Sequence, residues 1–450
     1  MKSKREHWVS SFGFIMAAAG SAIGLGSLWR FPYVSGDSGG GAFVLLYILF
    51  TLFIGVPLFI AELVIGRKTQ HAPILAYRNL SKKPQNWKVI GWLNLLTCFI
   101  ILSFYCVVSG WCLNYTLMSL NQFTLGKTPN EIRSIFETVY ISSDINLLWL
   151  FIFILLNLFI VQRGIRRGIE YWSRILTPSL FFILIGLFIY GFTLPGFAEA
   201  AHFILTPNFS KLTPIAVLNA LGMSFYTLSV GLGIVLTYGS YLRPSASLPK
   251  VGLIVATLAV VVSLMAALTI FPIVFTFNFP PEGGPGLVFQ TMPILFAKLP
   301  GNLVISTAFF LLLVFTALTS SISLFEVVVA NMTELFSFSR RKAMAIAACC
   351  TFILGIPSAL SGSKALFPNW TTIYGKDFFS TLNDVTATWM IPIAGLLTAL
   401  FVGYFTEKDA VFAEFERGTK LRGIYSIWRF AVRYLCPIAV ILIILDQVIF

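Results

Sequence analysis

The stretch GSAIGLGSLWRFP, residues 20–32, interrupts a long apolar run that begins near residue 12. Glycine costs about 1 kcal/mol relative to alanine in a helix interior, and unpaired backbone in lipid costs several kcal/mol per group. A helix broken here must therefore lie against protein or a polar cavity, whereas close helix packing through small residues is the simpler interpretation. The interrupting residues are Gly20, Gly24, Gly26, Arg30 and Pro32.

Composition predicts the class of the protein. Of its 450 residues, 57% are hydrophobic and only 11% are charged. A helix needs about 20 apolar residues to cross a bilayer, so we predict an all-α integral membrane protein with one transporter domain over residues 1–450. Eleven spans are expected, near 12–34, 42–65, 89–120, 146–162, 172–194, 214–239, 248–277, 302–336, 342–361, 378–405 and 427–449.

The net charge of +13 is unevenly distributed along the chain. With the N-terminus inside, the internal segments hold most of the lysines and arginines, among them Arg163, Arg166 and Arg167. This is the positive-inside pattern of membrane proteins. It predicts a cytoplasmic N-terminus and, with an odd number of spans, an external C-terminus, and it argues against a nucleic-acid partner. The bilayer is the expected partner, and the oligomeric state is left open.

Other function classes lack their sequence signals. None of the six cysteines or three histidines forms a metal-ligand pattern. A membrane enzyme would need a nucleophile–base pair or a metal cluster within the spans, and a channel would need filter sequences or charged rings. We therefore expect neither an enzyme nor a channel.

The sixth span repeats the interruption of the first one. It reads ALGMSFYTLSVGLGIVLTYGSY over residues 220–241, with Thr227, Ser229, Gly231 and Gly233 near its middle. Spans one and six begin two consecutive blocks of five, over about 10–195 and 212–406, and an extra helix follows at about 427–449. Paired interruptions in corresponding spans indicate an inverted-repeat secondary transporter with its site at the midplane.

Polar residues inside the spans are candidates for function. Glu62 has apolar neighbours on both sides, and because a buried intramembrane carboxylate needs a partner, we expect it to bind exposed NH groups of a broken helix. Tyr105 lies within the third span, where a structural role is the simpler interpretation. The run TALTSS, residues 316–321, offers hydroxyls that either bond their own helix or, by analogy with harder cations, bind sodium.

Several motifs in order resemble the neurotransmitter:sodium symporter family, especially its bacterial amino-acid transporters. They are REHW, GSAIGLGSLWRFPY, GGGAF, FYTLSVGLG, TYGSY and TALTSS. The resemblance covers nearly the whole chain and implies a sodium-coupled symporter that works by alternating access in a bacterial inner membrane. A sensor that binds but does not transport an amino acid is the alternative.

The resemblance also implies roles for the matching positions. Substrate would be held by Ser21, Ala22, Gly24, Leu25, Gly26, Ile101, Tyr105, Tyr226, Thr227, Ser229, Leu232, Ser320 and Leu324. A second sodium site would use Gly20, Ile23, Thr316, Thr319 and Ser320. Arg30 and Asp384 would pair as an outer gate under Tyr226, and Arg5 and Glu334 as an inner gate helped by Tyr241.

Gly24 stands where amine-transporting members of the family have an aspartate. It leaves room for a substrate that brings its own carboxylate, and no charged side chain lines the implied pocket. We therefore expect a neutral amino acid with an apolar or aromatic side chain.

Two ion sites depart from the family pattern. The implied first sodium site would use Ala22, Ser27 and Thr227, but Ala259 stands where the family has an asparagine or aspartate. We hypothesise that this site is weak or absent and that one sodium ion couples transport. The chloride site is matched only in part, by Tyr47 and Ser263, because Met223 replaces a glutamine.

Overall fold

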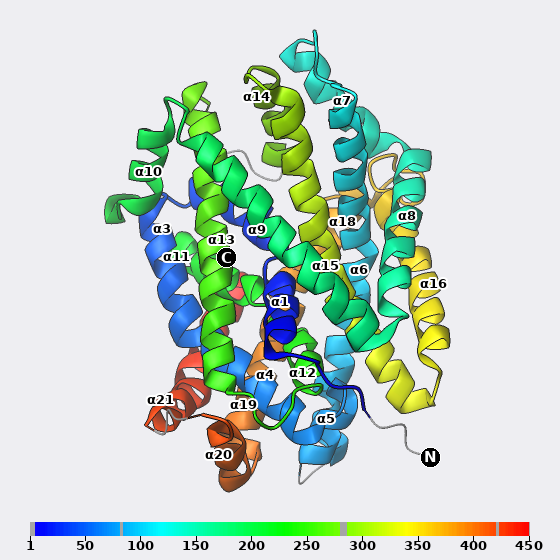
Figure 1. Ribbon diagram of the computed structural model, residues 1–450, viewed down its shortest axis with the longest axis vertical. Coiled ribbons are helices and arrows are strands. Elements are labelled where there is room, and N and C mark those ends of the chain that lie inside the picture. Colours follow the sequence, from blue (N-terminus) through cyan, green and yellow to red (C-terminus); the bar gives the residue numbers. More distant parts are fainter. Residues whose placement is uncertain (1–4, 82–83, 280–285, 420–422, 450) are drawn as a thin grey trace.

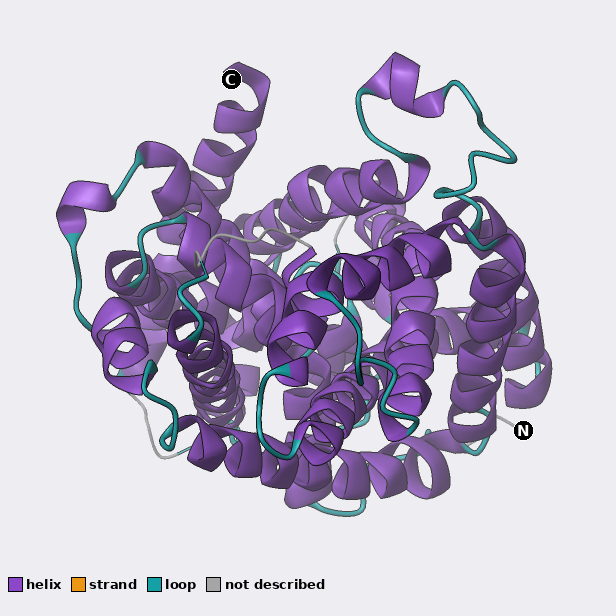
Figure 2. Cartoon of the chain, turned by 90° about the horizontal axis from the view of Figure 1, so that it is seen from above, coloured by secondary structure: helices purple, strands orange, loops and turns teal. Residues whose placement is uncertain are grey.

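The computed structural model describes residues 5–81, 84–279, 286–419 and 423–449. These residues form a bundle of helices without a strand, as predicted. Figure 1 shows most of the long helices running along one direction, and Figure 2 shows from above that the two chain ends lie at the periphery.

The helices follow the predicted spans closely. The first half of the chain contains α1 (Ser11–Ala22), η1 (Gly26–Arg30), α2 (Phe31–Asp37), α3 (Gly41–Phe50), η2 (Thr51–Gly55), α4 (Val56–Thr69), α5 (Pro73–Leu80), α6 (Pro84–Leu120), α7 (Pro129–Ile141), α8 (Ser143–Val161), η3 (Ile165–Glu170), α9 (Tyr171–Gly191) and α10 (Phe197–Leu205). The second half contains α11 (Pro214–Thr227), α12 (Ile234–Gly239), α13 (Leu248–Thr276), η5 (Leu287–Thr291), α14 (Met292–Ala297), α15 (Asn302–Phe336), α16 (Arg340–Ala359), α17 (Trp370–Tyr374), α18 (Phe378–Asp384), η6 (Val385–Met390), α19 (Ile391–Leu400), η7 (Phe401–Phe405), α20 (Lys408–Glu416), α21 (Ile424–Phe430), η8 (Ala431–Leu435) and α22 (Cys436–Ile449).

Within the described residues, nine continuous helical stretches are long and apolar enough to span a membrane. A tenth span forms if the bent pair Ser11–Ala22 and Gly26–Asp37 is counted together. The predicted sixth span is divided between α11 and α12, so neither half is long enough to count alone. The assignment of two inverted repeats remains a prediction.

The first span breaks where the glycines predicted it. Its two parts are bent by 50°. Ile23 ends α1 with its NH bonded to the Ala19 carbonyl, and Ser27 N donates to the Gly24 carbonyl at 3.0 Å. The aromatic ring of Tyr226 lies against Gly26, where a larger residue would collide with it.

The second break lies between α11 and α12 and depends on a buried acid. Gly231 and Gly233 have φ of +83° and +71°, a backbone conformation that glycine adopts without strain. The buried Glu62 carboxylate accepts hydrogen bonds from Gly231 N at 2.6 Å and Leu236 N at 3.3 Å. The prediction that Glu62 binds the NH groups of a broken helix is confirmed.

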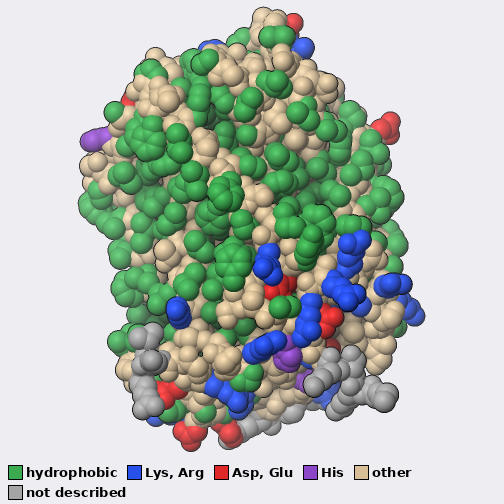
Figure 3. All heavy atoms as spheres, viewed as in Figure 1, with side chains coloured by type: hydrophobic (Ala, Val, Ile, Leu, Met, Phe, Trp, Pro, Cys, Tyr) green, Lys and Arg blue, Asp and Glu red, His purple; other side chains and the backbone are tan. Residues whose placement is uncertain are grey.

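The outer surface suits a bilayer. Large apolar side chains such as Phe182 and Ile353 are 75% and 63% exposed, and Figure 3 shows hydrophobic side chains spread over much of this face. On the same face, lysine and arginine side chains gather toward the end that carries the N-terminus. The two helix breaks, with their polar backbone groups, therefore lie inside a bundle whose outer surface is largely apolar.

Candidate functional site

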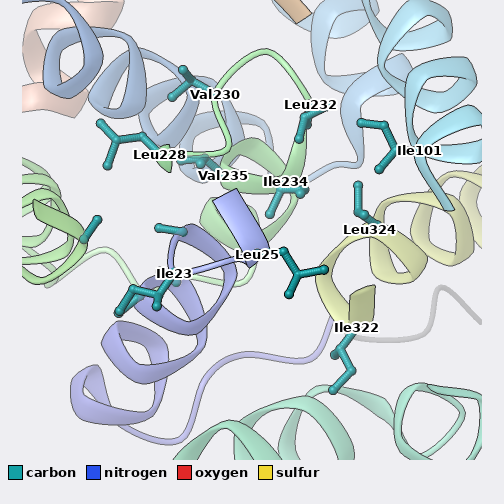
Figure 4. Packing of buried hydrophobic residues seen from close by; sticks show 14 of the residues in the cluster. Ile23, Leu25, Ile101, Leu228, Val230, Leu232, Ile234, Val235, Ile322 and Leu324 are labelled. Carbon is teal, nitrogen blue, oxygen red and sulfur yellow. The ribbon is translucent and has the colours of Figure 1, made fainter. Parts of the chain in front are cut away.

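A cavity of about 50 Å³ lies where the two broken helices meet α6 and α15. Figure 4 shows Leu25 at the first break with Leu324 and Ile234 nearby. Of the predicted substrate contacts, Thr227 alone is absent from the described lining. Those that line the cavity are Ser21, Ala22, Gly24, Leu25, Gly26, Ile101, Tyr105, Tyr226, Ser229, Leu232, Ser320 and Leu324.

One part of the cavity is polar. The carbonyl of Ser21 accepts hydrogen bonds from Ser229 Oγ at 3.1 Å and from Ser320 Oγ at 3.2 Å. The buried hydroxyl of Tyr105 makes no well-formed hydrogen bond to the described residues, although it lies near the Ser320 hydroxyl and the Leu25 NH. Because an unpaired buried hydroxyl costs free energy, Tyr105 is available to a ligand that enters next to Leu25 and Gly26.

The rest of the lining is apolar and includes residues that the sequence did not predict. Phe225, Val230, Ile234 and Ile391 also line the cavity. Val230 and Ile234 flank the predicted Leu232, so the glycine-rich break was a usable signal for them. Ile391 begins α19, and no local pattern connects that helix with the site. Its carbonyl packs against Gly231.

The residues of the implied second sodium site come together between α1 and α15. Gly20 packs against the side chain of Thr319, whose hydroxyl lies 3.0 Å from the Thr316 carbonyl. Ile23 lies at the adjacent end of α1, and Ser320 bonds the Ser21 carbonyl. The groups that would bind the ion are neutral carbonyl and hydroxyl oxygens, and hard cations prefer oxygen ligands. The chemistry of these residues therefore fits a sodium ion.

The implied first sodium site has fewer available oxygens. Ser27 Oγ is buried and, among the described residues, has no hydrogen-bond partner. Thr227 Oγ1 donates to the Met223 carbonyl at 3.0 Å and accepts from Tyr47 OH at 3.2 Å. Ala259 is fully buried and offers only a methyl group.

The partial chloride motif forms a closed group of hydroxyls. Ser263 Oγ lies 3.3 Å from Tyr47 OH and donates to the Ala259 carbonyl at 2.9 Å. Tyr47 in turn bonds Thr227. These hydroxyls bond one another and the backbone.

A wider vestibule of about 660 Å³ lies on the side of the cavity away from the N-terminus. It shares Leu25, Gly26, Tyr105 and Tyr226 with the cavity. The cavity and the vestibule therefore adjoin each other at these four residues.

The predicted ion pair between Arg30 and Asp384 is not formed in this structure. The Arg30 guanidinium lies over the Tyr226 ring, 5.0 Å from its centroid, and Asp384 pairs with Lys376. Arg30, the last residue of η1, and Asp384, the last residue of α18, both line the vestibule, and Lys376, which also lines it, is the cation that pairs with Asp384.

The other side of the cavity is closed by charged groups. Arg5 pairs with Glu334, donates to Ser240 and lies over the Tyr241 ring. Glu334 also accepts from Ala72 N at 2.9 Å and lies 3.2 Å from His71 Nδ1. The structure thus brings Arg5 and Glu334 together, as the sequence predicted.

Sequence reasoning missed a second charged pair on this side. Glu326 is fully buried, bonds Tyr241 OH at 2.6 Å and pairs with Arg340. Tyr241 thus bonds Glu326 while its ring lies under Arg5. The signal was available, because Glu326 is an acid inside an otherwise apolar run.

Comparison with known proteins gives the family. The sodium:neurotransmitter symporter family model matches residues 5–133 and 132–450. An uncharacterised sodium-dependent transporter of Bacillus subtilis, YhdH, is 34% identical over 448 residues, covering 99% of this chain and 98% of its own. A similar uncharacterised transporter of Haemophilus influenzae is 34% identical over 457 residues, with the same coverage.

A solved structure agrees with the fold. The crystal structure of MhsT in complex with L-phenylalanine has a TM-score of 0.90 and 36% sequence identity, covering 98% of this chain and all of that one. The chain therefore belongs to the sodium:neurotransmitter symporter family and is a sodium-dependent multi-pass membrane transporter, not an enzyme.

Proposed function

We propose that this transporter imports a neutral amino acid with an apolar or aromatic side chain, coupled to sodium. The observation that carries the proposal is the combination, in one buried cavity, of an apolar wall and the Tyr105 hydroxyl, which makes no well-formed hydrogen bond and lies near the Leu25 NH. The hydroxyl and the backbone at the start of η1 would bind the substrate carboxylate, because helix N-termini favour anions. Ile101, Leu232 and Leu324 would surround its side chain.

Charge and space support an amino acid over an amine. A side-chain carbon added to Gly24 would lie 2.9 Å from Ser320 Oγ, so an acidic side chain has no room there without movement. An amine would lack an anionic partner, whereas an amino acid supplies its own carboxylate. The structure of the relative MhsT with L-phenylalanine agrees with this class.

We further propose that one sodium ion couples transport, held by Gly20, Ile23, Thr316, Thr319 and Ser320. These residues provide carbonyls and hydroxyls around the end of α1, next to the substrate cavity. At the first site, Ala259 stands where the family has an oxygen ligand and offers only a buried methyl group. We expect the remaining side-chain oxygens, Ser27 Oγ and Thr227 Oγ1, to bind a second sodium ion only weakly.

The asymmetry of the two sides supports alternating access as the transport mechanism. The vestibule is open on one side, while Arg5 and Glu334 are paired on the other. We assign the paired side to the cytoplasm of a bacterial inner membrane, because the basic side chains gather there. The structure then represents an outward-facing state, and import requires the paired side to open.

Thermal-shift binding tests the substrate class. Purified protein would be heated with each of the twenty amino acids, first in sodium and then in potassium. We expect stabilisation by a few apolar or aromatic amino acids in sodium alone, because a ligand that binds only the folded state raises its stability. A shift with basic or acidic amino acids, or one indifferent to sodium, would contradict the proposal.

A further inference from the structure

Glu170, the last residue of η3, is a buried carboxylate that belongs to neither of the predicted gates. Its side chain accepts hydrogen bonds from Val9 N at 2.7 Å, Ser10 N at 3.2 Å and Ser10 Oγ at 3.2 Å. The residue is only 1% exposed. Hydrogen bonds to an ionised acceptor are about twice as strong as neutral ones, so this contact fixes the start of α1 against α9.

A second carboxylate makes the same kind of contact in the opposite direction. Glu6, in the N-terminal segment, accepts from Ile165 N at 2.7 Å, and Arg166 Nε donates to the His7 carbonyl at 3.1 Å. Each segment therefore bonds the backbone of the other. We define the residues of this contact, Glu6, Val9, Ser10, Ile165 and Glu170, as the α1–α9 clamp.

The clamp lies at the base of α1, the helix whose far end borders the cavity. Ser10 is the N-cap of α1, its Oγ accepting from Gly13 N at 2.9 Å, and α1 ends at the break beside the sodium and substrate residues. Farther along the two helices, Thr177 Oγ1 donates to the Met16 carbonyl at 3.0 Å. Rotation of α1 about its break would separate Val9 and Ser10 from Glu170.

We infer that Glu170 is a positioning residue that locks α1 against α9 and must release it before the cytoplasmic side can open. This inference rests on the proposed alternating-access function. It assigns the closed state two separate locks, the ion pair between Arg5 and Glu334 and the clamp on the opposite flank of the N-terminal segment. Release of either lock shifts the equilibrium toward cytoplasmic opening.

Cysteine labelling tests the inference directly. Cys349 and Cys350, which are exposed and half-exposed, would be replaced by alanine, and Val235→Cys would be the reporter. Val235 is 5% exposed and lines a small cavity with Phe14 and Ala18 of α1, so it becomes accessible when α1 moves away. Val139→Cys, at a site that is 4% exposed on α7, would be the matched control reporter.

The expected result is labelling of the Val235 reporter about tenfold faster in Glu170→Gln, with the control reporter unchanged. Tenfold corresponds to about 1.4 kcal/mol, less than the loss of a charged acceptor can provide. Glu199→Gln, an exposed acid on α10, is the matched substitution control. General loosening of the fold would instead accelerate labelling at both reporters.

Gly13→Ala provides a second, independent variant. A methyl group on Gly13 would occupy the place of the Glu170 carboxylate, whereas alanine itself favours the helix. This variant should therefore release the clamp without weakening α1. Labelling of the Val235 reporter within twofold of wild type in both variants, or equal acceleration at both reporters, would overturn the inference.

Uptake by the wild-type protein, measured in the same preparation, separates the two proposals. If the wild type carries no amino acid, the proposed function fails, whatever the labelling shows. If it carries one and the reporter does not respond to Glu170→Gln, the clamp alone is wrong.

Discussion

At the scale of single residues, the site depends on polar atoms whose partners are few and identifiable. Glu62 bonds two NH groups of the second break, whereas the Tyr105 hydroxyl and Ser27 Oγ make no well-formed hydrogen bond to the described residues. The Glu62 carboxylate stabilises the protein when no ligand is bound. The Tyr105 hydroxyl and Ser27 Oγ can gain a partner only when a ligand binds. Mutation of Glu62 should therefore lower stability, whereas mutation of Tyr105 should lower ligand affinity.

Tyr105→Phe removes a hydroxyl that makes no well-formed hydrogen bond to the described residues. We expect the thermal midpoint without substrate to stay within the error of wild type. Amino-acid affinity in sodium should fall by about tenfold or more, because a hydrogen bond to a charged group contributes about 1.5–3 kcal/mol. Calorimetric titration beside a melting curve measures both, and unchanged affinity would remove Tyr105 from the substrate site.

Glu62→Gln should behave in the opposite way. The amide keeps the shape but loses the charge, and because it has only one acceptor oxygen it can accept from Gly231 N or from Leu236 N but not from both. We expect a lower thermal midpoint even without ligands, with about 1.5–3 kcal/mol lost per charged hydrogen bond. Glu199→Gln, which is exposed, should leave the melting curve unchanged. Equal melting of both variants would show that the Glu62 contacts do not stabilise the break.

The contributions of the two sodium sites to sodium-dependent binding can be distinguished by removing one hydroxyl from each site. Thr319→Val should raise the sodium concentration for half-maximal binding by about tenfold, equivalent to about 1.4 kcal/mol. Ser27→Ala should change it by less than twofold, because the first site lacks a ligand at Ala259. Sodium titrations of substrate binding, with a Hill coefficient near one for wild type, would check this. A coefficient near two would contradict the single-sodium proposal.

At the scale of elements, the two broken helices create the site, and backbone conformation limits their sequence. Gly231 has a positive φ, and a side-chain carbon there would collide with the Ile391 carbonyl. Gly126 has a φ of +72° but open space around it. Substitutions at these two glycines therefore distinguish two contributions to stability. At Gly126 only backbone strain is added, whereas at Gly231 the packing between the second break and α19 is lost as well.

Gly126→Ala should therefore lower the thermal midpoint only slightly, since strain at a positive φ costs about 1–2 kcal/mol. Gly231→Ala adds displacement of α19 and disturbs the Glu62 hydrogen bond. We expect a much lower midpoint and loss of sodium-dependent substrate binding in Gly231→Ala alone. Similar melting of the two variants would show that contact between the second break and α19 is unimportant.

At the scale of the whole molecule, the sequence predicted the elements better than the contacts between them. Apolar runs and glycine clusters predicted the spans and both breaks, because membrane insertion and helix propensity act locally. The role of Glu62 followed because an isolated acid in lipid needs a partner. Ile391 could not be placed from sequence, since its position in the cavity depends on how α19 packs. The pairing of Asp384 with Lys376 depends on the open vestibule, which a sequence does not specify.

The proposal also makes the whole molecule asymmetric, open on one side and locked on the other. That asymmetry gives transport only if the locked side opens with substrate bound. A sensor with the same cavity would bind an amino acid in sodium and carry nothing. Binding measurements alone do not separate these two functions.

Uptake into proteoliposomes tests the central claim most directly. Vesicles containing the protein would receive a radiolabelled apolar or aromatic amino acid under an inward sodium gradient, with potassium replacing sodium as the control. We expect accumulation above the external concentration that collapses when the sodium gradient is dissipated, and about tenfold weaker apparent affinity in Tyr105→Phe. Sodium-dependent binding without accumulation, or accumulation unaffected by loss of the gradient, would contradict a sodium-coupled amino-acid transporter.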